Sequence, residues 1–469
     1  MVFANLIFLY LFLPLNILLY FISKNKAYRN IVLVAFSLFF YAWGEPVWIF
    51  LLIFTTLAEY LFGLWIEHGR GTVWAKVSMV LSLVLCFGLL GVFKYGDFII
   101  ENINQLLGTS IASMGFTLPI GISFYTFQIA SYLVDVYRGE VAAQRSFVKF
   151  LLFVSLYPQL VAGPIVRYSH IADEIDNRKI SPGEMQCGIS RFCIGLAKKV
   201  IIANVAGDFV QRYMGGDLAK LSVAGAWFGV IMFTIQIYFD FSGYSDMAIG
   251  MGWMFGFHYY ENFNYPYIAK SATEFWRRWH ISLGSFFRDY VYIPMGGNRK
   301  HQYFNLFVVW FLTGLWHGAS WNFILWGIYF GVLISIERLF LSKVLKKIPA
   351  VFSHLYLMLM VVIGWALFYF TDLGKLGTYL SIMFGGAGRS LWDLQLEITL
   401  ANNVFWIILA VVFCLPIVPK FKNWMQTKLS QGKQLSLFYV QIGLNLVLLV
   451  VSTAMLVGQS YNPFLYFRF

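Results

Sequence analysis

Long apolar segments constrain this chain more than any other feature of its sequence. An α-helix needs about 20 apolar residues to cross the hydrocarbon core of a bilayer. Candidate segments, two of them short, lie at 3–22, 31–43, 46–66, 77–95, 117–137, 147–166, 186–206, 222–242, 304–316, 319–340, 352–371, 400–418 and 436–458. The sequence therefore predicts an all-α polytopic membrane protein with roughly 10–13 membrane helices.

The composition supports this class and narrows the range of partners. Hydrophobic residues make up 59% of the chain and charged residues 12%, whereas a soluble domain carries about 25% charged residues. The formal net charge is +12, and in a membrane protein such an excess first indicates cytoplasmic loops. No soluble segment carries a basic cluster with interleaved aromatic residues, so we exclude nucleic-acid binding and expect the lipid bilayer as a partner.

The positions of the basic residues predict an orientation. Lys24, Lys26 and Arg29 follow the first apolar segment, and four lysines between 420 and 433 precede the last one. Basic loops are retained in the cytoplasm, so we expect the N-terminus and the C-terminal tail, residues 459–469, outside. Because no soluble domain interrupts the apolar segments, residues 1–469 are expected to form a single membrane domain.

Two histidines are the strongest functional candidates. His317 follows the apolar run 304–316 and precedes Gly318, so we expect it at a buried helix junction. An ionisable residue at membrane depth indicates function by default, and imidazole has the ordinary pKa best suited to a base at neutral pH. His280 lies in the amphipathic segment 272–294, which is expected to lie in the interface or to re-enter the membrane. The alternative for both is a structural role, and two histidines without a third ligand do not indicate a metal site.

Several charged residues accompany the histidines. Two acids, Asp240 and Asp246, lie in or beside the apolar segment 222–242 and need partners there. They either line a passage or form buried salt bridges that fix the fold. Basic side chains surround His280 in the sequence: Arg277, Arg278, Arg288, Arg299 and Lys300. These residues either bind the phosphates of a donor or only mark the cytoplasmic side.

Four motifs carry a resemblance to a known family. They are YPQLVAGPIVRY (157–168), YFDFSGYSDMAIGMG (238–252), ENFNYPYIAKSATEFWRRWHISLGSFFRDYVYIPMGGNR (261–299) and LTGLWHGASWNFILWG (312–327). With them the chain resembles the membrane-bound O-acyltransferase family over its whole length, and most of all the branch that serves bacterial alginate O-acetylation. The resemblance implies a central tunnel between a cytoplasmic and an extracellular funnel. It also implies that His317 is the catalytic histidine and His280 the second polar position.

The same resemblance implies a reaction and partners. The substrate donor would be acetyl-CoA or a similar cytoplasmic acetyl donor, with no bound cofactor. The location would be the bacterial inner membrane, the acceptor an extracytoplasmic polysaccharide, and an SGNH-hydrolase-like acetyltransferase would complete the transfer. A polytopic transporter or export channel, or a scaffold for a polymer synthase, is the alternative. A transporter would be expected to show repeat symmetry, of which the sequence gives no sign.

The chain ends in PFLYFRF, residues 463–469. This ending resembles the C-terminal motif of a small membrane partner in teichoic acid D-alanylation, in which a tyrosine carries the acyl group. The resemblance therefore implies that Tyr466 is an acyl relay on the outer side. The alternative is an aromatic anchor at the membrane surface.

Overall fold

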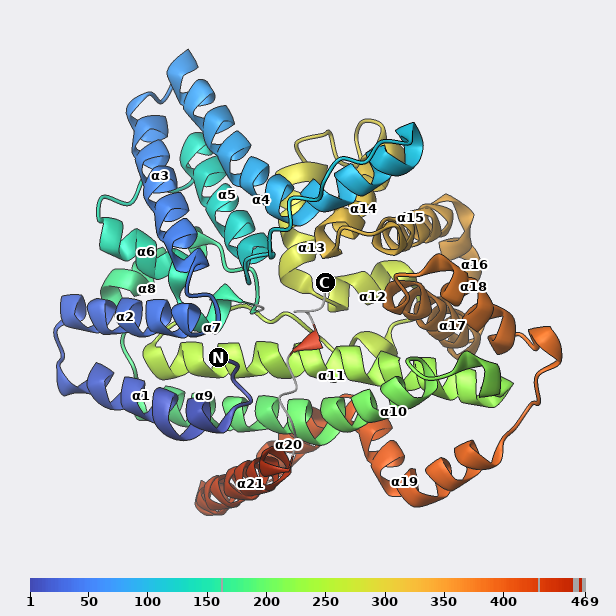
Figure 1. The fold of residues 1–469 in the computed structure, drawn as a ribbon. Helices are drawn as coiled ribbons and strands as arrows, with labels where there is room; N and C mark the ends of the chain where they lie inside the picture. Colours follow the sequence, from blue (N-terminus) through green and yellow to red (C-terminus); the bar gives the residue numbers. More distant parts are fainter. Residues whose placement is uncertain (162, 429–430, 459–463, 466–469) are drawn as a thin grey trace.

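The structure is a computed structural model that describes residues 1–161, 163–428, 431–458 and 464–465 (Figure 1). Within these ranges every regular element is a helix. Eight of the helices are long and apolar enough to cross a membrane. They are α2 (Lys26–Gly44), α3 (Trp48–His68), α4 (Val73–Leu107), α11 (Val223–Phe255), α15 (Trp321–Ile336, continued to Leu345), α17 (Ala350–Tyr369), α19 (Leu394–Phe413) and α21 (Gln431–Val457).

The remaining helices are shorter, and several continue one another. In the first half of the chain they are η1 (Phe8–Phe12), α1 (Leu13–Ile22), α5 (Ile122–Arg138), α6 (Phe147–Ser155), α7 (Tyr157–Leu160), α8 (Tyr168–Asn177), α9 (Pro182–Ala197), η2 (Lys198–Asn204), α10 (Val205–Tyr213) and η3 (Leu218–Lys220). In the second half they are η4 (Pro266–Ile268), α12 (Ala272–Arg278), α13 (Ile281–Phe287), η5 (Arg288–Tyr292), α14 (Gln302–His317), η6 (Glu337–Leu341), α16 (Ser342–Leu345), α18 (Leu373–Met383), η7 (Gly386–Gly388) and α20 (Ile417–Lys428).

The prediction of an all-α polytopic membrane protein is confirmed, and five of the predicted segments differ in detail. Segments 3–22, 117–137, 147–166 and 304–316 are, in the described ranges, helices too short or too broken to count among the eight. Segment 186–206 lies in the continuous helical run of α9, η2 and α10, but Arg191, Lys198 and Lys199 make it too charged to count. The segment 147–166 is broken at Leu156, between α6 and α7, because Pro158 has no N–H to donate to the carbonyl four residues earlier and is instead placed in the first turn of a new helix. The amphipathic segment 272–294 is divided into α12, α13 and η5.

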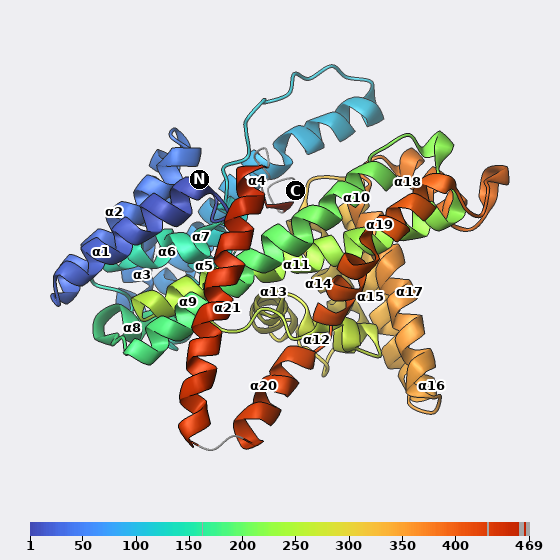
Figure 2. The ribbon, with the colours of Figure 1, turned by 90° about the horizontal axis from the view of Figure 1, so that it is seen from below.

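The helix α11 lies at the centre of the molecule (Figures 1 and 2). Ser222 caps its start by accepting a hydrogen bond from the Gly225 N–H, and Gly256 ends it in the left-handed conformation at φ 82°. Its residues from Ala226 to Phe239 belong to one apolar core, with α10, α12, α15 and α17, whereas those from Phe241 to Phe255 belong to a second, with α1, α5, α6 and α8. Asp240 therefore lies where the two cores meet.

The helices α9 and α11 approach one another at the backbone. A Cβ atom added at Gly195 of α9 would lie 2.6 Å from the carbonyl oxygen of Gly243 in α11. Helices in a bilayer associate through such close contacts of small residues, because lipid tails offer no competing hydrophobic effect. The contact brings η2, which continues α9, alongside the middle of α11.

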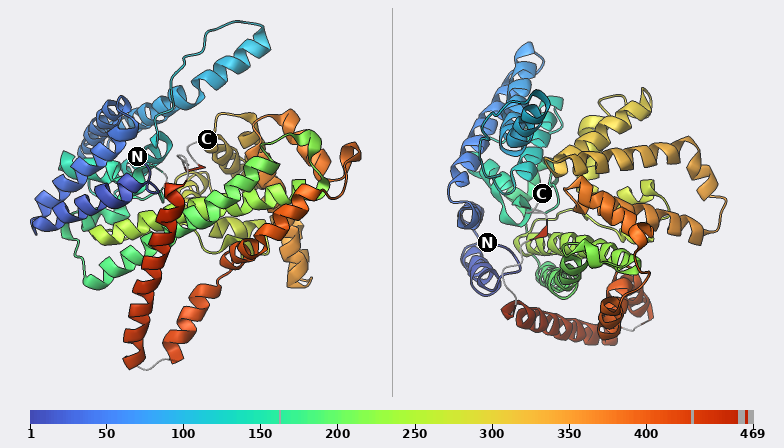
Figure 3. Two further views of the ribbon diagram at one scale, coloured as in Figure 1. Left: turned by 60° about the horizontal axis from the view of Figure 1, so that its bottom comes forward. Right: turned by 45° about the vertical axis from the view of Figure 1, so that its right-hand side comes forward.

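Phe3, near the N-terminus, and Phe464 pack on the same buried tyrosine of α11. The ring of Phe3 stacks on Tyr244 of α11 at 4.5 Å between centroids, and Phe464 packs on the same tyrosine at 4.9 Å. Before this, the chain runs through α19, α20 and α21 along the outer edge (Figure 3). α21 is held to α9 by Gln441 and Asn445, whose side-chain amides both donate to the Ser190 hydroxyl.

Candidate active site

His317 is the last residue of α14 and is buried, with 5% of its surface exposed. The next residue, Gly318, is extended, and α15 begins at Trp321, so the predicted helix junction is confirmed. α14 and α15 pack tightly because Gly314 lies against the Phe323 carbonyl, where a Cβ atom would overlap it. This contact sets the position of the α14 end that carries His317.

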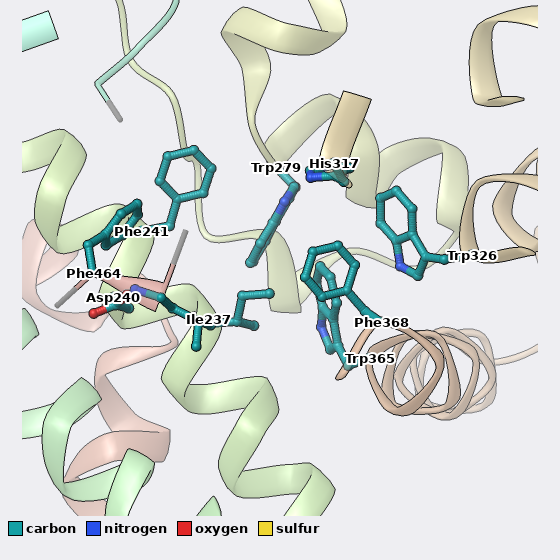
Figure 4. Close-up of a pocket in the computed structure, with 10 residues that line it drawn as sticks. Ile237, Asp240, Phe241, Trp279, His317, Trp326, Trp365, Phe368 and Phe464 are labelled. Carbon is teal, nitrogen blue, oxygen red and sulfur yellow. Dashed lines mark hydrogen bonds between the residues drawn. The ribbon is translucent and has the colours of Figure 1, made fainter. Parts of the chain in front are cut away.

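The surroundings of His317 are aromatic. Its ring stands nearly perpendicular to Trp326, at 4.9 Å and 86°, and to Phe368, at 5.3 Å and 82°. A cavity at this point is lined by Ile237, Asp240, Phe241, Trp279, His317, Trp326, Trp365, Phe368, Phe464 and Leu465 (Figure 4). The described side chains leave about 20 Å³ there for the centre of a water molecule.

His280 begins α13 in the left-handed backbone conformation, at φ 46° and ψ 53°, and is 2% exposed. A non-glycine residue in this conformation is strained and is often found at a functional site. Its Nδ1 lies 3.2 Å from the Asn262 Oδ1, which also accepts from the N–H and the hydroxyl of Ser282. Because this amide oxygen can only accept, Nδ1 carries the ring proton of a neutral His280.

The two histidines are brought together around one tryptophan. The Trp316 ring lies 5.8 Å from the His280 ring and 5.0 Å from the His317 ring. The Phe241 ring, which lines the His317 cavity, lies 4.6 Å from His280. His280 therefore lies behind Phe241 in the cavity wall, and its Nε2 has no hydrogen-bond partner among the residues that the structure describes.

Lys94, which was not among the functional residues predicted from the sequence, lies behind His317. Lys94 of α4 places its Nζ 2.5 Å from the Trp316 carbonyl oxygen and 3.4 Å from the Ser123 hydroxyl. The neighbouring Tyr95 hydroxyl donates to the Leu315 carbonyl. These donors satisfy carbonyls at the end of α14 that the helix itself leaves open. The presence of a lysine within the apolar segment 77–95 could have indicated from the sequence that Lys94 has a functional or structural role.

The two acids of α11 have different surroundings. The Asp240 carboxylate lines the cavity, lies 2.5 Å from the Lys199 Nζ and accepts the Leu465 N–H at 2.7 Å. Asp246 pairs with Lys198 at 2.6 Å and with Arg191 at 2.7 Å and does not line the cavity. Asp246 therefore agrees with the expected buried salt bridge, whereas Asp240 both forms an ion pair and lines the cavity.

The four arginines predicted to bind a donor do not line the His317 cavity. Arg278 pairs with Glu274 at 2.9 Å and Arg288 with Asp289 at 2.6 Å, while Arg277 and Arg299 are exposed. Their role in donor binding stays a prediction. Tyr466 lies outside the described residues, but the two residues before it, Phe464 and Leu465, are buried in the cavity wall.

The fold and the site define a class: a multi-pass, all-α membrane protein with two buried histidines beside an aromatic cavity. Comparison with known proteins then identifies the family. The family model for MBOAT, the membrane-bound O-acyltransferase family, matches residues 108–380. The chain is 38% identical to the probable alginate O-acetylase AlgI of Azotobacter vinelandii and 37% identical to that of Pseudomonas putida, in both cases over 100% of either chain.

The chain is also 32% identical to the peptidoglycan O-acetyltransferase of Helicobacter pylori, over 100% of this chain and 98% of the relative. The protein belongs to the membrane-bound O-acyltransferase family, and it is an acyltransferase. The predicted family and enzyme class are thereby confirmed.

Proposed function

We propose that the protein takes an acetyl group from a cytoplasmic thioester, acetyl-CoA or a similar donor, and passes it across the membrane for O-acetylation of an extracellular or cell-wall polysaccharide such as alginate. The names of the alginate and peptidoglycan acetylating relatives support the reaction and the class of acceptor. The observation that carries the proposal is that His317 and the C-terminal residues Phe464 and Leu465 line one buried cavity.

His317 supplies the base in this proposal. An acceptor hydroxyl oxygen bonds to the acetyl carbonyl carbon, the carbon–sulfur bond breaks, and the hydroxyl proton passes to His317. The departing thiolate then takes that proton, so the products are an ester and a free thiol. The aromatic walls around His317 exclude water, which protects the thioester from hydrolysis.

For His280, assistance to the base fits better than polarisation of the thioester carbonyl. Its neutral ring carries the proton on Nδ1, bonded to Asn262, so Nε2 has a lone pair and no hydrogen to donate. We infer that His280 accepts a hydrogen bond within the cavity and orients the reacting groups beside Trp316.

Tyr466 is the proposed first acceptor of the acetyl group. The residues that precede it line the cavity that holds His317, which supports this role. An SGNH-hydrolase-like partner outside the membrane would then move the acetyl group from Tyr466 to a sugar hydroxyl. Arg277, Arg278, Arg288 and Arg299 are the proposed contacts for donor phosphates on the opposite side.

The proposed orientation has both termini outside the cytoplasmic membrane of a bacterium. The shared packing of Phe3 and Phe464 on Tyr244 supports a common side for the two ends of the chain. The basic residues Lys24 and Lys26, between α1 and α2, support a cytoplasmic loop there.

Mass spectrometry of the purified protein after incubation with isotopically labelled acetyl-CoA tests this function. We expect free CoA and an acetyl ester on Tyr466 in the wild type, and no ester in Tyr466→Phe or His317→Ala. Tyr439→Phe, at an exposed tyrosine of α21, serves as the matched control and should behave as the wild type. If the wild-type protein consumes no thioester, the proposed donor is wrong. If Tyr466→Phe supports full acetylation of the polymer, the proposed role of Tyr466 as acyl carrier is wrong.

A further inference from the structure

The described end of the chain is held by a specific contact in the cavity wall. The backbone N–H of Leu465 donates to the Asp240 Oδ2 at 2.7 Å. Asp240 is 1% exposed, and Leu465 is 7% exposed. Every non-proline residue offers a backbone N–H, so this contact holds the segment at Asp240 and, together with the ring contacts of Phe464, fixes which residue faces the cavity.

The second carboxylate oxygen of Asp240 has its own partner. Its Oδ1 lies 2.5 Å from the Nζ of Lys199, which is 6% exposed and belongs to η2. A buried acid–lysine pair adds little net stability, because removing two charges from water costs about as much as their attraction returns. Stability of the fold alone therefore does not account for the pair. Its arrangement does: the contact of Lys199 with Oδ1 holds the carboxylate in one orientation and leaves Oδ2 for the C-terminal segment.

The side chain of Phe464 is held by the same stretch of α11. Its ring lies 5.7 Å from that of Phe241 and 4.9 Å from that of Tyr244. Phe241 and Phe464 both line the cavity that holds His317, and Figure 4 shows Phe464 and Asp240 together on the side of the cavity away from Trp326. The C-terminal segment is thus fixed by one backbone contact and two ring contacts from consecutive turns of one helix.

We propose that Asp240, oriented by Lys199, is a positioning residue that sets the register of the C-terminal segment at the His317 cavity. Asp240 and Lys199 are called the anchor pair below. The anchor pair holds Leu465, and Tyr466 is the next residue in the sequence. The consequence for acyl transfer rests on the proposed function, whereas the anchoring itself is measured without it.

The accessibility of residue 465 tests the anchor directly. Leu465→Cys is introduced together with Cys187→Ser, which removes the exposed native cysteine, since Cys86, Cys193 and Cys414 are buried. The rate of labelling by a membrane-impermeant maleimide is then compared with and without Asp240→Ala/Lys199→Met, a change that removes both charges and leaves neither unpaired. Because a hydrogen bond to a charged group is lost, we expect labelling to become faster by about 10- to 100-fold.

A control ion pair lies further along α11. Asp246→Ala/Lys198→Met removes a partly buried ion pair for which no contact with the described residues 464–465 is seen, and Arg191, the other partner of Asp246, still pairs with Glu261. We expect this variant to leave the labelling of residue 465 unchanged. If the anchor-pair variant also leaves labelling unchanged, the proposal is wrong. If the anchor-pair variant is not recovered folded, Phe464→Ala provides a second test. It removes the ring contacts with Phe241 and Tyr244 and should also expose residue 465 to labelling.

The catalytic readout separates this proposal from the function on which it rests. If both hold, the anchor-pair variant has a lower kcat for ester formation with an unchanged KM for the donor, because the acceptor is misplaced while the donor site is intact. Faster labelling together with wild-type ester formation would support the anchoring by Asp240 and Lys199, but it would contradict the role of the C-terminal segment as acceptor. Unchanged labelling would overturn the anchor whatever the activity.

Discussion

Asn262→Ala is the perturbation for which the structure gives the most detailed expectation. Asn262 is fully buried, and its Oδ1 accepts from the Ser282 N–H at 3.1 Å, from the Ser282 hydroxyl at 2.9 Å and from the His280 Nδ1 at 3.2 Å. Alanine removes the acceptor for all three. The hydroxyl can rotate to another partner, but the two N–H groups have no such freedom.

The magnitude follows from those two donors. A buried donor left without an acceptor costs about 1–3 kcal/mol, so the two N–H groups together cost about 2–6 kcal/mol. Part of this cost destabilises the fold, and part is avoided when the His280 ring turns away from its wild-type orientation. If about 1.4–2.8 kcal/mol falls on the transition state, kcat drops about 10- to 100-fold.

The assay is release of free thiol from acetyl-CoA by purified protein, with the unfolding temperature measured in parallel. Asn30→Ala is the matched control, because Asn30 is also a buried asparagine and donates to the Ile175 carbonyl far from the histidines. We expect the control to lose stability and keep its kcat. Asn262→Asp keeps an acceptor at the same place and should recover part of the rate. An unchanged kcat in Asn262→Ala would refute the inferred role of His280.

Three further predictions concern the end of α14, its packing on α15 and the cap of α9. Lys94→Met leaves the Trp316 carbonyl without its Nζ donor, so ester formation should fall about tenfold, as measured by thiol release. Gly314→Leu should abolish recovery of monodisperse protein in size-exclusion chromatography, whereas Gly88→Leu, at a position with open space, should not. The backbone N–H of Ser181 lowers the pKa of Glu184, so this contribution to stability is present above the ordinary carboxyl pKa and is lost as the pH falls. The unfolding temperature of the wild type should therefore approach that of Glu184→Ala as the pH is lowered.

The membrane class and the position of His317 were predictable from local sequence. An apolar run that ends in a histidine and a glycine has few arrangements other than a buried helix end, and α14 ends at His317 as expected. Helix ends were less predictable, because proline and capping residues decide them. The predicted span 186–206, for example, begins instead at a Ser181–Glu184 capping box, with Pro182 at its first turn.

The partners of the site residues were not predictable, because they come from distant parts of the chain. Lys199 and Asp240 meet through the close approach of α9 and α11, and Lys94 reaches the end of α14 from α4. Asn262 lies in the motif at 261–299, but local sequence does not show that its amide oxygen faces His280 Nδ1. Pairings of this kind depend on tertiary packing, which apolar periodicity does not encode.

In the proposed function, the imidazole of His317 removes a proton from the acceptor hydroxyl. Thiol release from saturating acetyl-CoA by His317→Gln tests it most directly, because glutamine keeps hydrogen-bonding groups and removes the base. With an unchanged unfolding temperature, we expect a rate lower by about 10²–10⁴-fold. A His317→Gln protein that releases thiol and forms ester at the wild-type rate would contradict it.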